Sequence, residues 1–337
     1  MNTDLFDYVL PEELIAQDPI LERDKSRLLV LHKQTGAIEH RLFSDLVEYL
    51  NEGDLIVLND ARVTARRLLG HKSTDVKVEA LLLKPLGNNS YEALVKPGRR
   101  LKPGAWIEFD DGIRAQVGTS TPFGGRILQF EGNGSVEDRI ANAGLVPLPP
   151  YIHKQLLDPE RYQTVYSQTG GSAAAPTAGL HFTSELLDSI RLKGIGIAKI
   201  TLDVSLDTFR PVRTDTLEEH PMHGEHYTIS PETAEIIREC KGRIIAIGTT
   251  AVRALEASAI GKRNVQSGDA FTRIFITPGY EFQVIDGMAT NFHLPRTTML
   301  AMVSALSGRE NLFHAYRQAV QERYRFLSFG DAMLIVP

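Results

Sequence analysis

The sequence is poor in cysteine and in long apolar runs, and each absence excludes a class of protein. Cys240 is the only cysteine among 337 residues, so no disulfide can form within the chain. This usage is typical of a reducing compartment, and we expect a cytoplasmic protein. No apolar run approaches the roughly 20 residues that span a bilayer. The acidic start, Met1 to Asp7, also lacks the basic and apolar layout of a signal peptide.

Excess charge is small over the whole chain but uneven along it. Between Arg62 and Ala105 there are ten Lys or Arg residues and three Asp or Glu residues. That segment therefore carries +7, and the remainder must carry −12 to reach the net charge of −5. A basic segment on an acidic body is typical of a surface that binds a polyanion such as nucleic acid. Alternatively, the lysines protect the edges of a sheet.

Two kinds of hydrophobic pattern occur in different parts of the chain. Short strand-like runs separated by Gly, Pro, Asn and Asp predict a small β-sandwich or barrel, at 76–83, 91–96, 105–109, 113–117 and 126–130. Outside this block, longer apolar strands at 27–32, 54–59, 197–202, 243–247, 272–277 and 281–285 are mixed with helical patterns at 42–50, 185–193, 230–240, 297–306 and 310–324. We therefore predict an α/β domain formed by 1–65 and 146–337, with 66–145 inserted as a compact β domain.

The stretch 172–183 has neither helical nor strand periodicity. It is rich in small residues, and Pro176, Thr177, Gly179 and His181 follow within six positions. Small residues let the backbone approach a ligand closely, and a titratable His181 would be a plausible acid or base there. The alternative is an ordinary loop that leads to a helix capped by Thr183 or Ser184.

Several further polar groups follow strands and are candidates for a site. Asp60 and Arg62 come after one apolar strand, where open α/β sheets bind ligands, although an Asn-Asp turn would account for them equally. Asp203 and Asp207 follow another strand; they could bind a metal, hold two hydroxyls, abstract a proton or simply be solvated.

A strand followed by Gly248, Thr249 and Thr250 and then a helix would offer backbone N–H groups to an anion. On that helix Arg253 could serve the site or pair with Glu256, three residues further on. A second stretch resembling a site contains Asn291, His293 and Arg296, just before the next helix.

Three histidines and a carboxylate lie within seven residues, at His220, His223, Glu225 and His226. This composition suggests zinc, and a metal-dependent hydrolase is one alternative function. The spacing matches no strong zinc motif, and Pro221 and Gly224 oppose the helix that such motifs require. Contacts to a polar substrate, or an ordinary solvated surface, would use the same residue types.

Several blocks in a fixed order resemble one family, the S-adenosylmethionine:tRNA ribosyltransferase-isomerases of queuosine biosynthesis. The resemblance runs nearly end to end and includes Leu10-Pro-Glu-Glu-Leu-Ile-Ala-Gln17, Pro147-Leu-Pro-Pro-Tyr-Ile152, Ala174-Ala-Pro-Thr-Ala-Gly-Leu-His-Phe-Thr183, Thr208-Phe-Arg-Pro-Val212, Gly248-Thr-Thr250, Thr290-Asn-Phe-His-Leu-Pro295 and Gly330-Asp-Ala-Met333. It implies an α/β main domain with an inserted small antiparallel β-barrel domain.

The resemblance also implies a reaction. The family moves the ribosyl group of S-adenosylmethionine onto 7-aminomethyl-7-deazaguanine at the wobble position of tRNA with a GUN anticodon. Epoxyqueuosine-tRNA forms, and adenine and methionine leave. A base must remove a proton beside the sulfonium, and an acid must assist the departure of adenine. S-adenosylmethionine is then a co-substrate, and neither a prosthetic group nor a metal is expected, because the sulfonium supplies the electrophilic drive. We expect a monomer.

Roles for individual residues follow from this resemblance and from residue chemistry. We expect the acid–base residues to be His181 and His293, followed by His223, Glu225 and Asp203. We expect the substrate to be bound by Thr177, Gly179, Thr249, Thr250, Arg253 and Asn291. We expect tRNA phosphates to be bound by Arg62, Arg66, Arg99, Arg100 and Lys102.

One motif departs from the family pattern Thr-Leu-His-Val-Gly-x-Gly-Thr-Phe. Here a histidine is replaced by Asp203, and two glycines by Ser205 and Asp207. The new residues restrict the backbone, and Asp207 adds charge. The departure leaves open a family fold with an altered substrate or activity. A non-catalytic RNA-binding module that uses the β insert is a further alternative.

Overall fold

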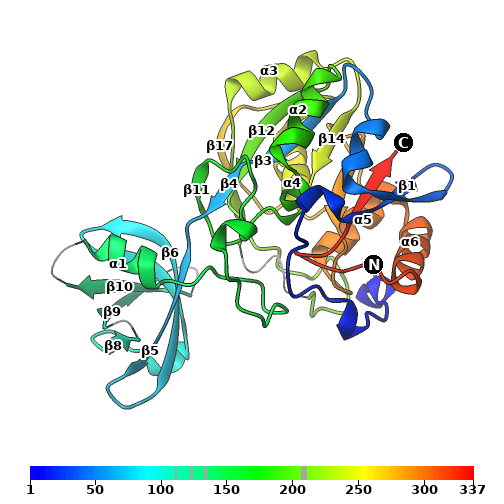
Figure 1. Cartoon of the computed structure of the whole chain (residues 1–337). Coiled ribbons are helices and arrows are strands. Elements are labelled where there is room, and N and C mark those ends of the chain that lie inside the picture. The colour runs from blue at the N-terminus through cyan, green and yellow to red at the C-terminus, as the bar shows by residue number, and fades with distance from the viewer. Residues whose placement is uncertain (111, 122–123, 133–134, 206–210) are drawn as a thin grey trace. The chain divides into compact units, whose positions relative to one another are not determined.

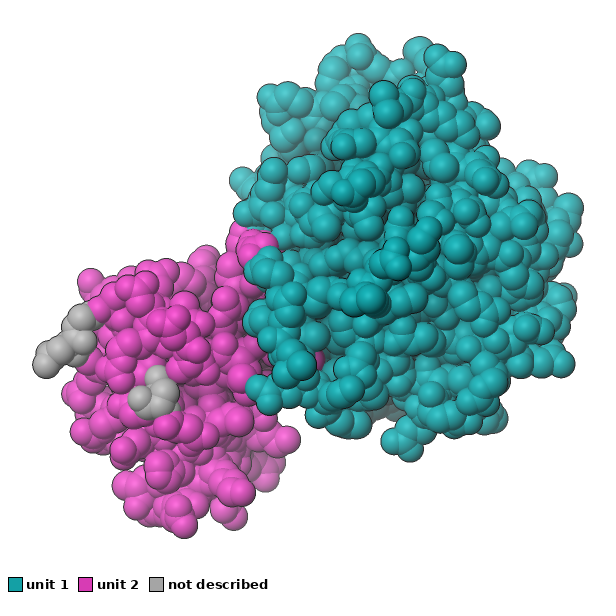
Figure 2. Space-filling view, in the orientation of Figure 1, with its two compact units in different colours: residues 1–61, 149–169, 175–337 teal, residues 62–148, 170–174 magenta. Residues whose placement is uncertain are grey.

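The computed structural model describes residues 1–110, 112–121, 124–132, 135–205 and 211–337. Backbone contacts divide the chain into two compact units (Figure 2). The first unit contains Met1–Ala61, Pro149–Thr169 and Ala175–Pro337, and the second contains Arg62–Leu148 and Gly170–Ala174. No helix in the described part of the chain is both long and apolar enough to cross a membrane.

A nine-stranded mixed sheet organises the first unit (Figure 1). Its order is β17-β13-β12-β3-β14-β18-β19-β1-β2, and β12, β3, β14 and β18 are mutually parallel. The strands are β1 (Arg27–His32), β2 (Ile38–Leu42), β3 (Leu55–Asn59), β12 (Gly196–Leu202), β13 (Glu225–Ile229), β14 (Ile244–Ile247), β17 (Gly268–Thr272), β18 (Gly287–Asn291) and β19 (Ala332–Val336). Every residue of β3, β14, β18 and β19 is buried, as expected for central strands that are covered on both faces.

Helices flank this sheet and begin at caps that the sequence encodes locally. The Thr183 side chain accepts a hydrogen bond from Leu186 N at 3.1 Å, and Ser230 caps the helix that begins at Pro231. The α-helices of this unit are α2 (Ser184–Leu192), α3 (Pro231–Glu239), α4 (Thr249–Ala257), α5 (Thr298–Ser307) and α6 (Arg309–Gln321). The 3₁₀ turns are η1 (Thr3–Phe6), η2 (Glu12–Leu14), η3 (Arg23–Lys25), η4 (Phe43–Tyr49), η6 (Pro159–Tyr162) and η7 (Thr177–His181). The helical pattern expected at 42–50 is thus a 3₁₀ helix.

The strands predicted at 272–277 and 281–285 are wrong. β17 ends at Thr272, and a short hairpin of β15 (Ala259–Gly261) and β16 (Asn264–Val265) precedes it. The backbone N–H groups of Gln283, Val284 and Ile285 instead donate to the Glu256 carboxylate, at 2.8, 3.0 and 3.1 Å. A side chain on α4 therefore takes the place that a neighbouring strand would occupy.

The second unit is a closed barrel of six antiparallel strands in the order β10-β7-β6-β5-β8-β9. Its strands are β5 (Arg66–Lys72), β6 (Lys77–Gly87), β7 (Ser90–Lys96), β8 (Trp106–Phe109), β9 (Arg114–Ser120) and β10 (Arg126–Glu131), with the 3₁₀ turn η5 (Gly98–Arg100) and the helix α1 (Val136–Ala143). Pairing of β10 with both β7 and β9 closes the barrel around a core that includes Leu68, Phe109 and Phe130. The predicted α/β domain with an inserted small antiparallel β-barrel is confirmed.

Two short strands, β4 (Ala61–Val63) and β11 (Thr169–Ser172), pair with each other, and each contains one of the points at which the chain passes from the first unit to the second. Within the second unit, the Thr64 N–H donates to the Ser172 carbonyl at 3.3 Å.

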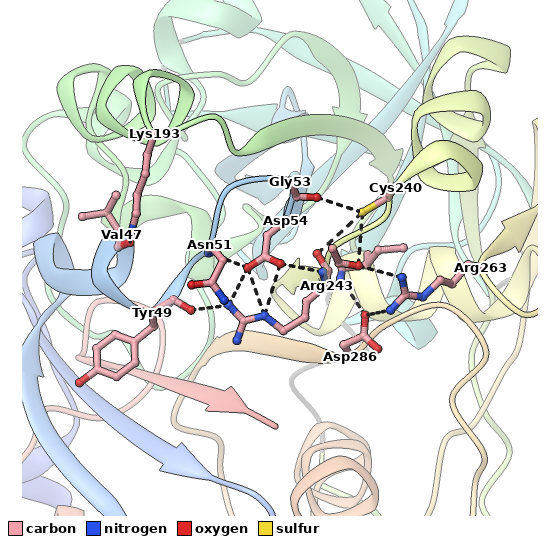
Figure 3. A network of polar contacts seen from close by, with 12 residues as sticks. Val47, Tyr49, Asn51, Gly53, Asp54, Lys193, Cys240, Arg243, Arg263 and Asp286 are labelled. Atoms are coloured by element: carbon pink, nitrogen blue, oxygen red, sulfur yellow. Dashed lines mark hydrogen bonds and ion pairs between the residues drawn. The ribbon is translucent and has the colours of Figure 1, made fainter.

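A polar network lies where β3 and β14 begin (Figure 3). The buried Asp54 carboxylate accepts hydrogen bonds from the backbone N–H of Asn51 and of Arg243, at 2.8 and 2.7 Å, and pairs with the Arg243 guanidinium at 2.6 Å. The thiol of Cys240 lies 3.6 Å from the carbonyl oxygens of Gly53 and Gly242. These contacts pair Asp54 and Arg243 at the amino ends of β3 and β14. The candidate site lies at the opposite, carboxyl ends of the strands.

Candidate active site

A cavity lies at the carboxyl ends of the parallel strands in the first unit. It encloses about 530 Å³ between protein atoms, part of it open to solvent. Segments distant in sequence line it: 175–178 around η7, 248–250 at the start of α4, 290–294 after β18, and also Tyr151, Val204, Met299, Leu327 and Ser328. Gly248 has φ +89, a conformation that other residues rarely adopt, so a glycine lets β14 turn directly into α4. This is where an open α/β sheet binds its ligand.

Five of the residues expected at the site line this cavity, namely Thr177, Thr249, Thr250, Asn291 and His293. Thr250 presents a buried hydroxyl that has no hydrogen-bond partner among the described residues. Because an unpaired buried hydroxyl is costly, a ligand group at this position would be stabilised.

His181 lies behind the cavity wall. Its Nε2 is 3.2 Å from Asn291 Nδ2, and its Nδ1 is 2.7 Å from Ser26 Oγ. The ring stacks on Phe43, with the centroids 4.8 Å apart, and borders a separate small cavity next to Arg23. Burial, together with the nearby guanidinium groups of Arg23 and Arg325, lowers the pKa of His181 to about 3. The imidazole is therefore neutral at pH 7.

His293 lines the cavity, and its backbone is held from both sides. Tyr8 donates to the His293 carbonyl at 2.5 Å, and the His293 N–H donates to the Tyr316 hydroxyl at 2.9 Å. The ring Nε2 lies 2.8 Å from Thr290 Oγ1. Burial lowers the pKa of His293 to about 3, so this ring too is neutral at pH 7.

A second cavity of about 310 Å³ shares Thr249, Thr250 and Met299 with the first. The ion pair of Arg253 and Glu225 also lines it. The remaining lining residues are mostly apolar: Met222, Ile274, Phe275, Ile276, Thr298 and Met302. Arg253 Nη1 donates to the Glu225 carboxylate, both side chains are buried, and Arg253 Nε has no partner among the described residues.

The charge of this pair is held in place by its neighbours. His223 Nε2 lies 3.5 Å from the Glu225 carboxylate, which also accepts from Ser205 N at 3.0 Å. Burial alone would raise the pKa of Glu225, but the hydrogen bond with His223 and the charge of Arg253 outweigh it and hold the pKa below its usual value. Arg253 therefore pairs with Glu225 and not with Glu256, which binds the backbone of 283–285.

A family model described as a queuosine biosynthesis protein matches residues 3–335. This chain belongs to that family.

Relatives agree over the whole length of the chain. One from Heliobacterium modesticaldum is 52% identical over 344 residues, with 100% of each chain covered, and one from Symbiobacterium thermophilum is 53% identical with 98% of each covered. Both are named S-adenosylmethionine:tRNA ribosyltransferase-isomerase. A crystal structure of an S-adenosylmethionine tRNA ribosyltransferase from Thermotoga maritima is 37% identical, has a TM-score of 0.56, and covers 98% of this chain and 100% of that one.

The family's motif that differs in this chain lies partly within the described residues. Asp203 directly follows β12, and its carboxylate is 4.0 Å from the exposed His226 ring. It lines neither cavity, whereas its neighbour Val204 lines the larger one. Asp207 lies outside the described residues.

The cluster of histidines predicted as a possible zinc site does not converge. His220 packs edge-on against Phe275, His223 approaches Glu225, and His226 approaches Asp203. Within the described ranges, no group of three or more His, Cys, Asp and Glu side chains is placed to hold a metal ion. The comparisons with known proteins give no support to the hydrolase alternative.

Gly179 and the predicted tRNA-binding cations line neither cavity. Gly179 lies in η7, where a Cβ would come within 2.1 Å of the Tyr166 hydroxyl, so its small size serves packing within the unit. The five cations all belong to the second unit. Arg99, Arg100 and Lys102 are exposed around η5, whereas Arg62 and Arg66 are partly buried.

Sequence reasoning did not single out several residues at this site. Tyr151 and Ser328 line the larger cavity, with 2.7 Å between their hydroxyls, and Ser26 holds His181. Tyr151 lies in the family block 147–152, and that block was the available signal for it. Nothing local marks Ser26, because its role depends on a histidine 155 residues away.

Proposed function

We propose that this protein is an S-adenosylmethionine:tRNA ribosyltransferase-isomerase. It transfers and isomerises the ribosyl group of S-adenosylmethionine onto 7-aminomethyl-7-deazaguanine at the wobble position of tRNA, and it releases adenine and methionine. The observation that carries the proposal is the whole-length identity of about half to relatives named for this activity. S-adenosylmethionine and a tRNA with a GUN anticodon are the substrates, and the protein acts as a cytoplasmic monomer without a prosthetic group.

The two adjoining cavities fit the two halves of S-adenosylmethionine. The larger one is lined by hydroxyl and amide groups suited to a ribose and a base. The smaller one combines methionine and isoleucine side chains with the buried pair of Arg253 and Glu225. An amino-acid zwitterion matches such a pair, because its carboxylate can meet Arg253 Nε while its ammonium remains near Glu225. We assign the nucleoside to the larger cavity and the methionyl group to the smaller one.

His293 is our proposed proton acceptor at the carbon beside the sulfonium. It lines the larger cavity and is neutral at pH 7. The lowered pKa makes it a weak base, and the positive sulfonium, which acidifies the neighbouring carbon, is what lets it accept the proton. Glu225 and His223, at the smaller cavity, are the next candidates. Asp203 is assigned no proton transfer, because its side chain lines neither cavity.

The inserted barrel is our proposed binding surface for tRNA. The segment between Arg62 and Ala105 carries +7, and Arg99, Arg100 and Lys102 are exposed on it. Phosphate contacts of this kind supply affinity without reading sequence.

The deciding experiment incubates the protein with S-adenosylmethionine and a tRNA that carries the aminomethyl base. We expect free adenine and free methionine in equal amounts, together with the mass gain of an epoxycyclopentanediol on the tRNA. Binding of S-adenosylmethionine without turnover of this tRNA would support the altered-substrate alternative. Binding of tRNA alone would support an RNA-binding module.

A further inference from the structure

A chain of hydrogen bonds runs from the backbone of η3 to the wall of the larger cavity. Ser26 Oγ donates to the Arg23 carbonyl at 3.2 Å and lies 2.7 Å from His181 Nδ1. His181 Nε2 lies 3.2 Å from Asn291 Nδ2, and Asn291 Oδ1 accepts from the Thr177 hydroxyl at 2.9 Å. Four side chains from three separate parts of the sequence therefore form one line that ends at the cavity.

The Asn291 amide sets the direction of the bonds in this line. Asn291 Nδ2 can only donate, so Nε2 of a neutral His181 ring accepts and Nδ1 carries the proton. Ser26 Oγ accepts from His181 Nδ1–H, and its own proton goes to the Arg23 carbonyl, which can only accept. Nε2 takes a proton from the Asn291 amide, and the amide oxygen takes the proton of Thr177.

The neutral state that this order requires is favoured by the surroundings of the ring. His181 is 4% exposed, and it stacks on Phe43. The two charged groups that act on it, Arg23 and Arg325, are both cationic and oppose protonation. A protonated ring would donate from both nitrogens and would reverse the amide of Asn291.

Thr177 lies at the cavity end of this line, and it donates its hydroxyl proton to Asn291 Oδ1. Its side chain is only partly buried and lines the larger cavity, so its oxygen lone pairs are what a ligand meets. We infer that Ser26 and His181 are positioning residues, which orient Asn291 and make Thr177 an obligate acceptor for a hydroxyl or N–H donor of the ligand.

The ligand group that Thr177 recognises is a ribose hydroxyl of S-adenosylmethionine; this assignment rests on the proposed function. The larger cavity holds the nucleoside in that proposal, and the ribose hydroxyls are its donors nearest to the reacting carbons. A fixed acceptor orients the ribose, as its rearrangement requires.

The test measures binding by calorimetry, without tRNA, so that chemistry does not enter. The probes are S-adenosylmethionine and its 2′-deoxy and 3′-deoxy analogues. The variants are Thr177→Val, Thr177→Ser, Ser26→Ala, His181→Ala and His181→Gln. Ser304→Ala is the matched control, because Ser304 is equally buried but its hydroxyl has no partner among the described residues.

We expect the wild-type protein to lose about tenfold in affinity when one of the two hydroxyls is removed, the usual effect of one hydrogen bond. Thr177→Val should bind S-adenosylmethionine about tenfold more weakly and should no longer distinguish that analogue, whereas Thr177→Ser should behave as wild type. Ser26→Ala and His181→Ala should lose most of the discrimination. His181→Gln should retain it, since the glutamine oxygen can accept from Asn291 and carries no titratable proton.

Particular results would overturn the inference. Unchanged discrimination in Thr177→Val would show that Thr177 does not accept from the ligand. Equal discrimination in Ser26→Ala and Ser304→Ala would remove Ser26 from the chain, and a loss in His181→Gln as large as in His181→Ala would give His181 a different role. Failure of the wild-type protein to release adenine from S-adenosylmethionine in the presence of the aminomethyl tRNA would instead overturn the proposed function.

Discussion

At the scale of single residues, the site relies on buried polar groups whose charge state is set by their surroundings. His181 and His293 are both neutral at pH 7 because burial disfavours the imidazolium form. Glu225 is charged because Arg253 and His223 outweigh the cost of burying it. Two neutral imidazoles and one buried ion pair therefore lie within one unit of the protein.

The two histidines should make stability depend on pH. Each has a pKa near 3 when folded and an ordinary value near 6.5 when unfolded, so between those values the unfolded state binds more protons. The free energy of unfolding is thus retained above about pH 6.5 and lost as the pH falls, by about 1.4 kcal/mol per pH unit for each histidine. Urea unfolding at pH 6.0, 5.5 and 5.0 measures the slope. His181→Gln should reduce its histidine part by half, and an unchanged slope would contradict the assigned pKa.

We expect the Thr250 hydroxyl to strengthen ligand binding without contributing to the stability of the fold. Its hydroxyl is buried and unpaired within the described residues, so Thr250→Val should leave the free energy of unfolding unchanged or raise it by about 1 kcal/mol. The same variant should bind S-adenosylmethionine several-fold more weakly. Thr233→Val is the control: the Thr233 hydroxyl donates to the Lys199 carbonyl at 2.8 Å, so its loss should destabilise the protein. Destabilisation by Thr250→Val of equal size would show that its hydroxyl has a partner.

At the scale of elements, the Glu256 side chain supplies hydrogen-bond acceptors that a neighbouring strand would otherwise supply. Glu256 on α4 accepts from three consecutive backbone N–H groups and from the Tyr280 hydroxyl at 3.1 Å. The segment 281–285 has the apolar pattern of a strand, yet its donors are satisfied without a neighbouring strand. This contact joins the helix that begins at the cavity to the loop before β18, which ends at Asn291.

Glu256→Ala should therefore free that segment. Three donors, two of them buried, would lose their acceptor, and we expect a loss of about 3 kcal/mol or more in the free energy of unfolding. Hydrogen exchange at Gln283, Val284 and Ile285 should accelerate, while the amides of β14 remain protected. Glu235→Ala, at an exposed ion pair on α3, serves as the control and should change stability by less than about 0.5 kcal/mol. Unchanged exchange at 283–285 would contradict the anchoring role.

At the scale of the whole molecule, the predicted tRNA-binding cations and the two cavities belong to different units. Both cavities lie in the unit with the nine-stranded sheet, and the exposed cations around η5 lie in the barrel. The two functions can be changed separately, because none of the described residues of the barrel lines either cavity.

Replacing Arg99 and Arg100 by alanine should weaken tRNA binding without affecting S-adenosylmethionine. The loss of two phosphate contacts should reduce the slope of log affinity against log salt by about 1.5. Titrations between about 50 and about 200 mM salt measure that slope. The double variant Arg191→Ala with Arg238→Ala, on α2 and α3, is the control of equal charge. A slope that falls equally in both double variants would place the RNA elsewhere.

The sequence by itself determined what depends on neighbours along the chain. Continuous apolar runs marked β1, β3, β12 and β14 but not β18 or β19. Thr183 and Ser230 marked helix starts, because a cap bonds only to the next turn. The basic segment and the spacing of short strands marked the barrel. The ordered family motifs identified the family.

Only the tertiary structure decided which of the candidate side chains meet. Arg253 and Glu256 lie one turn apart on α4, but Arg253 pairs with Glu225 on β13. Glu256 instead accepts hydrogen bonds from the backbone of 283–285. His181 was expected as an acid or base, and in the structure it bonds to Asn291 and Ser26, 110 and 155 residues away. The reason is physical: a buried polar group takes whichever partner the packed sheet brings to it, and that partner is not encoded in local spacing.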